Sequence, residues 1–169
     1  MIKSLGKHFK KYLDLYIIIL ASVFGIFIFY SSGKKLEFPI AVFGVGISIA
    51  FSLRQYRIEN DKMFKELFIM YNEKYDTKFN NCLNEIDKEV SKDSSYKLSE
   101  IQKPIIIDYL NLCAEEYLWY RKGRIDTLAW NSWERGMKYY LNISAIKKVI
   151  QNEQKQKDSY YGIFDYLNL

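Results

Sequence analysis

Two stretches near the beginning of the chain contain no charged residue. Residues 15–31 and 38–53 lack Asp, Glu, Lys and Arg, whereas charged residues recur at helix-like intervals after Arg54. Apolar residues would fall on every face of a helix built over either stretch, and a helix of a soluble protein keeps a polar side. With a rise of about 1.5 Å per residue, a helix of about 18 residues covers roughly 27 Å, close to the hydrocarbon core of a bilayer. The pattern predicts a transmembrane helical hairpin in residues 1–53, with spans of about 15–32 and 36–53.

A hairpin buried in a soluble core and a cleaved signal peptide are the alternatives. Lys3, Lys7, Lys10 and Lys11 would form the basic beginning of a signal peptide, and residues 31–33 are small, as a signal peptidase requires. However, the apolar stretch is longer than a usual signal core, and a second stretch follows within a few residues. A hairpin that is retained in the membrane accounts better for this pattern.

The chain after the second apolar stretch is predicted to be helical. Between Leu53 and Asp76 neither Pro nor Gly occurs, and apolar residues recur three and four positions apart. We therefore expect residues 54–75 to continue the second membrane helix into the cytoplasm. Residues 54–169 are predicted to form a cytoplasmic helical domain. The expected fold class is all-α, with a transmembrane hairpin followed by a helical bundle.

Single residues mark the expected helix boundaries in this domain. Thr77 is a candidate N-cap for a helix that reaches Val90, and Ser99 is a candidate for the start of the helix after a polar loop. Gly123 is expected to end that helix in the left-handed conformation. Asp126 is then expected to cap the next helix.

Basic residues are concentrated beside the apolar stretches. The formal net charge is +5, with lysines clustered in residues 3–11 and basic residues in 54–65, whereas the turn between the stretches has only Lys34 and Lys35. The larger basic clusters of a membrane protein stay in the cytoplasm, so both termini are predicted to be cytoplasmic. The basic surplus fits contact with membrane lipids better than a nucleic-acid partner.

The residues that usually carry catalysis or metal binding are scarce. His8 is the single histidine, and Cys82 and Cys113 lie on different predicted helices. A metal site needs several clustered His, Cys or carboxylate ligands, and the chain has no glycine-rich phosphate loop. The sequence therefore predicts no catalytic residue, no metal site and no cofactor, and we do not expect an enzyme. Cys113 falls in an apolar pattern and is interpreted as a packed thiol.

Polar residues gather in the sequence around the turn at Gly123. They can be interpreted as a ligand-binding or nucleotide-binding set, or as a hydrogen-bonded contact that fixes the pairing of two helices. The second interpretation is favoured, because buried charges need partners whether or not they act on a ligand. The residues of this predicted polar cluster are Asn111, Glu115, Glu116, Arg121, Arg124, Asn131, Glu134 and Arg135.

The second apolar stretch has two faces made of small residues. At 100° per residue, one face lies within an arc of about 80°, and the other lies opposite. Small residues let helices approach closely, so one face can meet Ala21 and Gly25 of the first span. The other face is then expected to meet a second protomer or to form a mildly polar wall facing water. The alternative is that these residues have no such role, because glycine and serine are common in membrane helices. The oligomer or pore-lining candidates are Ala41, Gly44, Ser48 and Ser52 on one face and Gly46 and Ala50 on the other.

The order of these segments, together with the stretch YLNLCAEEYLWYRKGRIDTLAW, resembles small bacterial membrane proteins of phage defence. It is similar in particular to the membrane accessory proteins of type VI-B CRISPR systems. The resemblance covers the layout of the whole chain and rests on the helix of Glu115 and Glu116, the Gly123 turn and the helix start at Ile125 and Asp126. It implies location in the bacterial inner membrane, assembly into a pore and a cytoplasmic defence effector as partner.

The resemblance also implies a degenerate HEPN-like fold for the helical domain. Active HEPN RNases need an Arg-x4–6-His motif, whereas Arg121 and Arg124 have no histidine after them. Our first hypothesis is therefore a homo-oligomeric membrane effector of antiphage defence that opens a pore or perturbs the membrane. The alternatives are a passive membrane anchor that recruits a cytoplasmic partner and, disfavoured by the missing histidine, a membrane-tethered RNase.

Overall fold

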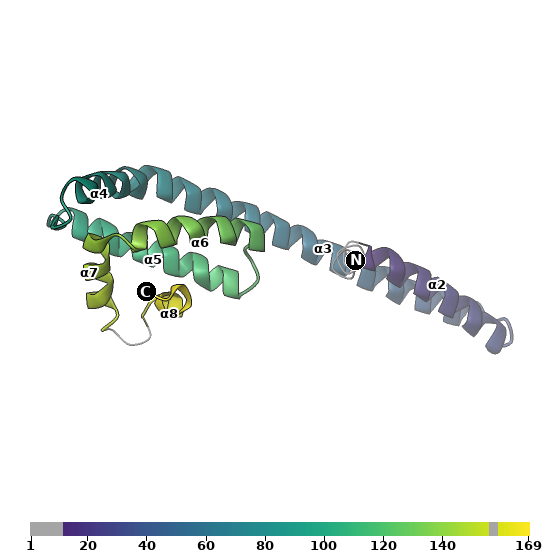
Figure 1. Cartoon of the computed structure of the whole chain (residues 1–169). Coiled ribbons are helices and arrows are strands. Elements are labelled where there is room, and N and C mark those ends of the chain that lie inside the picture. Colours follow the sequence, from purple (N-terminus) through teal and green to yellow (C-terminus); the bar gives the residue numbers. More distant parts are fainter. Residues whose placement is uncertain (1–11, 156–158) are drawn as a thin grey trace. The chain divides into compact units, whose positions relative to one another are not determined.

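The computed structural model describes residues 12–155 and 159–169, and every regular element in these ranges is helical (Figure 1). The prediction of an all-α chain is confirmed for this part of the sequence. The basic residues at 3–11 and His8 lie outside the described residues. In chain order the elements are α2 (Leu13–Ser31), α3 (Glu37–Lys74), the π-helical turn η1 (Tyr75–Phe79), α4 (Asn80–Lys92), α5 (Gln102–Arg121), α6 (Thr127–Leu141), α7 (Ser144–Glu153), the 3-10 turn η2 (Ser159–Gly162) and α8 (Ile163–Leu167).

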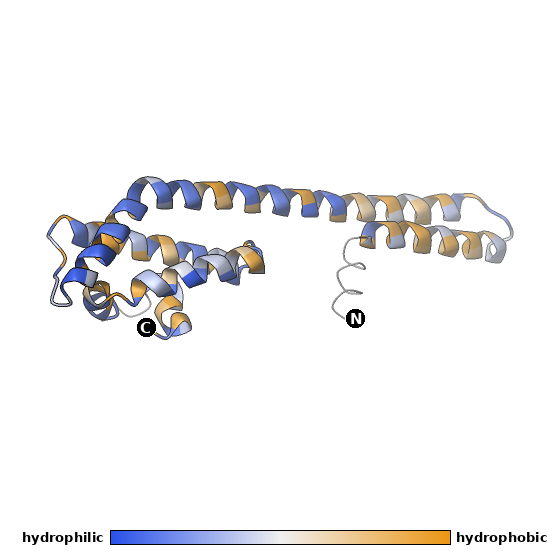
Figure 2. Ribbon diagram, turned by 45° about the horizontal axis from the view of Figure 1, so that its top comes forward, coloured by the Kyte–Doolittle hydropathy of each residue, from blue (hydrophilic) through white to orange (hydrophobic). Residues whose placement is uncertain are grey.

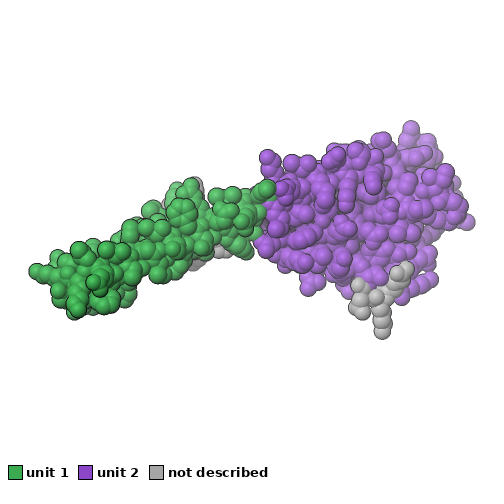
Figure 3. Space-filling view, turned by 180° about the vertical axis from the view of Figure 1, so that it is seen from behind, with its two compact units in different colours: residues 1–62 green, residues 63–169 purple. Residues whose placement is uncertain are grey.

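The chain divides into two compact units, 1–62 and 63–169 (Figure 3). The boundary predicted after residue 53 lies within α3, in unit 1. An ion pair explains why the residues just beyond 53 belong with the hairpin. Arg57 Nη2 lies 2.7 Å from Asp14 Oδ2, so this part of α3 is held to the first turn of α2. We refer to the two parts as unit 1 and unit 2.

Unit 1 is a helical hairpin in which α2 packs against the first part of α3. The contact is close because both helices present small residues to each other. A Cβ atom built on Gly46 would overlap with the Cβ atom of Ala21, and Ala50 is almost completely buried. Nearer the turn, Gly25 packs against Pro39. Only glycine at position 46 permits this approach of the two backbones.

Hydrophobic residues predominate in α2 and in the part of α3 that packs against it, as the colours of Figure 2 show. α2 and α3 each contain an apolar stretch long enough to cross a membrane. Almost no residue in either stretch is buried. This distinguishes them from core helices of a soluble protein, whose apolar residues are buried. Large side chains that point into the surroundings include Leu20, Val23, Ile26, Phe27, Ile40, Val45 and Phe51.

Unit 2 is organised around α5. This helix contacts η1, α6, α7, η2 and α8, and it buries side chains on several faces. Ile106, Leu110 and Cys113 are essentially inaccessible. They pack with buried side chains from the surrounding elements, among them Leu83, Ile86, Trp130, Leu141, Ile146 and Ile163.

The expected helix boundaries near α5 and α6 are confirmed. Ser99 Oγ accepts a hydrogen bond from the Gln102 backbone N–H, and Gln102 Oε1 accepts one from the Ser99 N–H, which together form a capping box. At the other end of α5, Gly123 has a φ of +69°, and the following N–H donates to the Trp119 carbonyl. This is the left-handed helix ending that glycine favours. Asp126 caps α6 by accepting a hydrogen bond from the Leu128 N–H at 2.7 Å.

The expected cap at Thr77 is wrong. Helical structure continues without a break from Glu37 to Lys92, and Thr77 lies inside the π-helical turn η1. Its hydroxyl donates to the Glu73 carbonyl at 2.7 Å, one turn earlier, instead of capping a new helix. A threonine hydroxyl can bond in this way within a helix, so a threonine alone does not mark a boundary.

The α2–α3 contact can be tested with a cysteine pair at Gly25 and Pro39. A Cβ atom on Gly25 would lie 3.8 Å from the Pro39 Cβ, which is the usual separation in a disulfide. We expect Gly25→Cys with Pro39→Cys to form an intramolecular disulfide on mild oxidation. The readout is the number of thiols that react with a maleimide-linked polymer after denaturation. If the disulfide forms, only the thiols of Cys82 and Cys113 react.

Within this pair background, Gly46→Leu should reduce disulfide formation, because an inserted side chain costs about 1 to 3 kcal/mol at a closely packed position. Gly44→Leu is the matched control, since a Cβ at Gly44 would meet no atom within 4 Å among the described residues. Equal disulfide yields in the two variants would contradict the observed helix pairing.

Candidate functional site

The structure distinguishes between the two small-residue faces of α3. Gly46 and Ala50 are buried against α2. The other face, formed by Ala41, Gly44, Ser48 and Ser52, is exposed and lines a shallow groove on α3. The serine hydroxyls on this face bond to their own helix, from Ser48 to the Gly44 carbonyl and from Ser52 to the Ser48 carbonyl, both at 2.9 Å. We call these four residues the outer small-residue face.

The residues of the predicted polar cluster do not come together in one place. Asn111 and Glu115 are exposed and line a hollow with Glu153 and Tyr160. Glu116 lies on a different face of α5, where it lines a separate pocket. Adjacent helical residues differ by about 100°, which explains why Glu115 and Glu116 take part in different environments.

The remaining members of that set lie near the end of α5 and along α6. Arg121 donates from Nη1 to the Tyr161 carbonyl at 3.4 Å, and Arg135 donates from Nε to the Asn131 carbonyl at 3.1 Å. Glu134 pairs with Lys138 at 2.7 Å one turn along α6. Arg124 is half-buried between the two helices in sequence. Tyr161 also lines the hollow of Asn111 and Glu115, so Arg121 contacts the border of that hollow. Glu134 additionally accepts a hydrogen bond from the Tyr166 hydroxyl at 3.3 Å.

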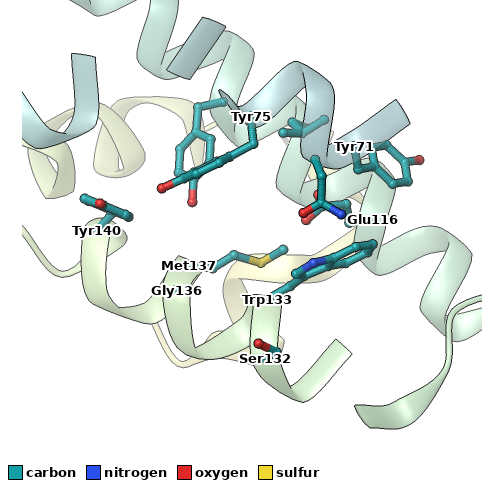
Figure 4. Close-up of a pocket in the computed structure, with 11 residues that line it drawn as sticks. Tyr71, Tyr75, Glu116, Ser132, Trp133, Gly136, Met137 and Tyr140 are labelled. Carbon is teal, nitrogen blue, oxygen red and sulfur yellow. The ribbon is translucent and has the colours of Figure 1, made fainter. Parts of the chain in front are cut away.

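The pocket that contains Glu116 lies between the end of α3, η1, α5 and α6, entirely within unit 2 (Figure 4). It has a volume of about 160 Å³. Aromatic rings form most of its wall, and Gly136 adds no side chain on the α6 side. We call this the aromatic pocket. Its lining includes Tyr71, Tyr75, Tyr109, Glu116, Trp133 and Tyr140.

Contacts between the rings hold the aromatic pocket in shape. The Trp133 ring meets Tyr71 edge-on, with centroids 6.0 Å apart, and stacks on Phe68 at 5.5 Å. On the opposite wall, the Tyr109 ring lies 6.3 Å from Tyr75 and 5.6 Å from Phe79. Each of these pairs adds about 1 kcal/mol beyond the area it buries. The rings are therefore fixed before any ligand enters.

Glu116 is a carboxylic acid inside an apolar wall. Its side chain is only 6% exposed, and in the part of the chain that the structure describes it makes no hydrogen bond. Burial raises the pKa of Glu116 to about 8, and the negative charge of Glu115 adds to this effect. Lys74 opposes the shift, but its ammonium group lies 3.8 Å from the Glu115 carboxylate, outside the aromatic pocket. Glu116 is consequently protonated in much of the protein at neutral pH.

Two other groups near Glu116 are also buried. The Tyr71 hydroxyl has no hydrogen-bond partner among the described residues, and burial raises its pKa. Burial likewise raises the pKa of the Cys113 thiol well above its ordinary value. A thiol that remains protonated is a poor nucleophile, which supports the interpretation of Cys113 as a packed residue.

The sequence places Glu116 beside Tyr109 on α5, but it does not show that Tyr71, Tyr75 and Tyr140 line the same pocket. A signal for its burial was present, since Glu116 follows Tyr109, Leu112 and Cys113 at seven, four and three positions on the apolar face of α5. No comparable signal brings Tyr71 and Trp133 together, because they are distant in sequence and meet only through packing.

No protein-family model matches the chain, and no curated protein or solved structure shows detectable similarity to it. The candidate site therefore rests on the residues and geometry described above.

Replacing Glu116 by Gln should remove a pH dependence of stability. The pKa is about 8 in the folded protein and 4.5 for an unperturbed glutamate, so between these values the folded state holds a proton that the unfolded state has released. The free energy of unfolding of the wild type should fall as the pH rises from 4.5 to about 8, by up to about 5 kcal/mol. Glu116→Gln lacks this fall and should be the more stable protein at about pH 9.

Thermal unfolding of the full chain in mild detergent, followed by tryptophan emission, measures this effect because Trp119, Trp130 and Trp133 all lie in unit 2. The matched control is Glu115→Gln, which neutralises the neighbouring exposed carboxylate and should keep most of the wild-type slope. If the stability of Glu116→Gln changed with pH in the same way as that of the wild type, the Glu116 carboxyl would not be the cause of the pH dependence.

Proposed function

We propose that this chain is a two-span protein of the bacterial inner membrane that associates with further copies of itself. Two observations support the membrane location. The segments 15–31 and 38–53 have no charged residue, and their large apolar side chains are exposed in unit 1. Exposed apolar surface of this extent is unfavourable in water and favourable in lipid. The helical backbones bond within themselves, as the bilayer core requires.

The exposure of the outer small-residue face is the observation that carries the proposal of self-association. The opposite face, at Gly46 and Ala50, is already occupied by α2. A Cβ atom on Gly44 would meet no atom within 4 Å among the described residues, so the backbone of α3 is accessible there. Close backbone approach at small residues drives association of helices in lipid. A second copy presents the same type of surface and is the partner we propose.

We further propose that the oligomer acts as a membrane effector of antiphage defence, as the resemblance of the sequence implies. In this role the helical unit would be a degenerate HEPN-like domain that responds to a cytoplasmic defence effector, and the hairpins would open a pore or perturb the membrane. The chain would have no catalytic role of its own, because Arg121 and Arg124 are not followed by a histidine.

A specific observation favours the second candidate, a passive membrane anchor. The hydroxyl groups of Ser48 and Ser52 donate to carbonyls of their own helix, so these donors are already used in unit 1. A face whose hydroxyl donors are satisfied internally fits helix contact better than an aqueous pore wall. Self-association and ion leakage must therefore be measured separately.

Reporter fusions test the proposed topology. The basic residues at 3–11 and 54–65 predict that both ends of the hairpin face the cytoplasm. Fusions after residue 12, within 33–36 and after Leu169 should report inside, outside and inside. A C-terminal fusion that reports outside would reverse the orientation and contradict the proposed contact with a cytoplasmic effector.

The double variant Gly44→Leu with Ser48→Leu tests self-association. It places bulky side chains on the outer small-residue face and should convert the oligomer to a folded monomer, because helix contact in lipid depends on van der Waals packing. The readout is the molar mass in mild detergent by size exclusion with light scattering, combined with ion leakage in cells. A wild-type oligomer in this variant would refute the proposed interface.

The double variant Gly46→Leu with Ala50→Leu is the matched control on the buried face. It should lower the yield of the folded hairpin rather than release an intact monomer, because α2 occupies this face. Loss of the oligomer together with loss of leakage in the outer-face variant would support the effector. An oligomer that never conducts would support the passive anchor.

A further inference from the structure

The aromatic pocket combines rings and a carboxyl group in a way that a simple core does not require. Five aromatic side chains line it, and four of them form ring contacts in pairs, Tyr71 with Trp133 and Tyr75 with Tyr109. Glu116 lies on the wall contributed by α5 (Figure 4). Its side chain is only 6% exposed, and burial of this extent disfavours the charged form of a carboxyl group. An apolar residue of similar size would avoid this cost if the pocket only filled space.

A cation is the ligand that would use both features. The face of an aromatic ring is electrically negative and attracts a positive charge placed over it, most strongly for tryptophan. A carboxylate in the same apolar wall strengthens that attraction, because charges interact more strongly where water is excluded. Lys74 does not line the pocket, although its ammonium group pairs with Glu115 and lies 6.0 Å from the centre of the Tyr71 ring. The residues that line the pocket include no basic side chain, so a positive group that faces Glu116 inside it must come from a ligand.

The size of the pocket restricts the class of cation. Its volume of about 160 Å³ is below the range of sites for drug-sized molecules, about 300 to 1,000 Å³, so a nucleotide or a peptide does not fit. A metal ion also fits poorly, because the described residues contain no cluster of three or more His, Cys, Asp or Glu side chains that could hold one. Ring faces do not replace the water ligands of a metal ion, whereas they pack well against methyl groups on nitrogen.

We propose that the aromatic pocket binds a small organic ammonium ion, with Glu116 as its counter-ion and the rings of Tyr71, Trp133 and their neighbours as a cage. This site lies in unit 2 and does not depend on the proposed membrane oligomer. Binding would make the helical unit respond to the concentration of a small cationic metabolite. If the oligomer experiments failed, the proposal of this ligand site would still stand.

Choline and its neutral isostere, the alcohol in which a tert-butyl group replaces the trimethylammonium group, test the proposal directly. The full chain is kept in a maltoside detergent and sodium phosphate buffer, because amine buffers and choline-like detergents would compete. Titrations at about pH 8.5 keep most of Glu116 ionised, given its pKa of about 8. Ligand-observed NMR should show saturable binding of choline at least about tenfold tighter than that of the isostere.

Glu116→Gln keeps the shape of the side chain and removes its charge. It should weaken choline binding about tenfold and leave the isostere within about twofold of its wild-type affinity, so the preference for the cation disappears. Glu115→Gln is the matched control, since this exposed neighbour lies outside the pocket. It should keep choline binding within about twofold of the wild type. Circular dichroism confirms that both variants remain folded.

A second readout locates the ligand at Trp133. Choline should change the tryptophan emission of the wild type and of Trp119→Phe, whose ring contacts Lys122 away from the pocket. The change should vanish in Trp133→Phe, which retains an aromatic ring. Equal affinity for choline and the isostere, an unaltered cation preference in Glu116→Gln, or no saturable binding of choline would each overturn the proposal.

Discussion

The burial of α5 on several faces is the constraint on which unit 2 depends. This helix packs against η1, α6, α7, η2 and α8, so most side chains along its middle must fit a protein interior, while Asp108, Asn111 and Glu115 remain exposed. Interiors are close-packed, and the surrounding helices therefore have little freedom to move relative to α5. Glu116 lies within this region, where water cannot stabilise its charge, and its raised pKa is a direct consequence. The aromatic pocket is formed where α3, η1 and α6 meet the same helix.

A different constraint governs unit 1, where small residues decide how closely helices approach. Gly46 allows α2 to contact the backbone of α3 next to Ala21, and this contact leaves the outer small-residue face of α3 exposed. In water such a hairpin would expose a large apolar surface, whereas in lipid it would be in its preferred environment. The same helix thus packs against α2 with one face and leaves the other face exposed.

The two proposals address different parts of the chain and different physical effects. Self-association depends on van der Waals contact along α3 within unit 1, and ligand binding depends on charge and ring orientation within unit 2. If both are correct, a small ammonium ion would be sensed by the helical unit of a membrane oligomer. Each proposal has variants that leave the other unit unchanged, so the two effects can be separated experimentally.

The sequence by itself determined the local features of this protein. The charge-free stretches, the all-helical class, the Ser99 and Asp126 caps and the glycine ending at Gly123 all depend on neighbours within a few positions, and such patterns are readable along the chain. The absence of a cap at Thr77 was missed because a threonine hydroxyl can bond inside a helix as well as at its start. Two small faces on α3 were also visible, but not which one α2 would occupy. Only the tertiary structure decided that choice. It also separated Glu116 from Glu115 and the other predicted polar residues, and it brought Tyr71 to Trp133. Each of these outcomes depends on the packing of helices that are distant in sequence.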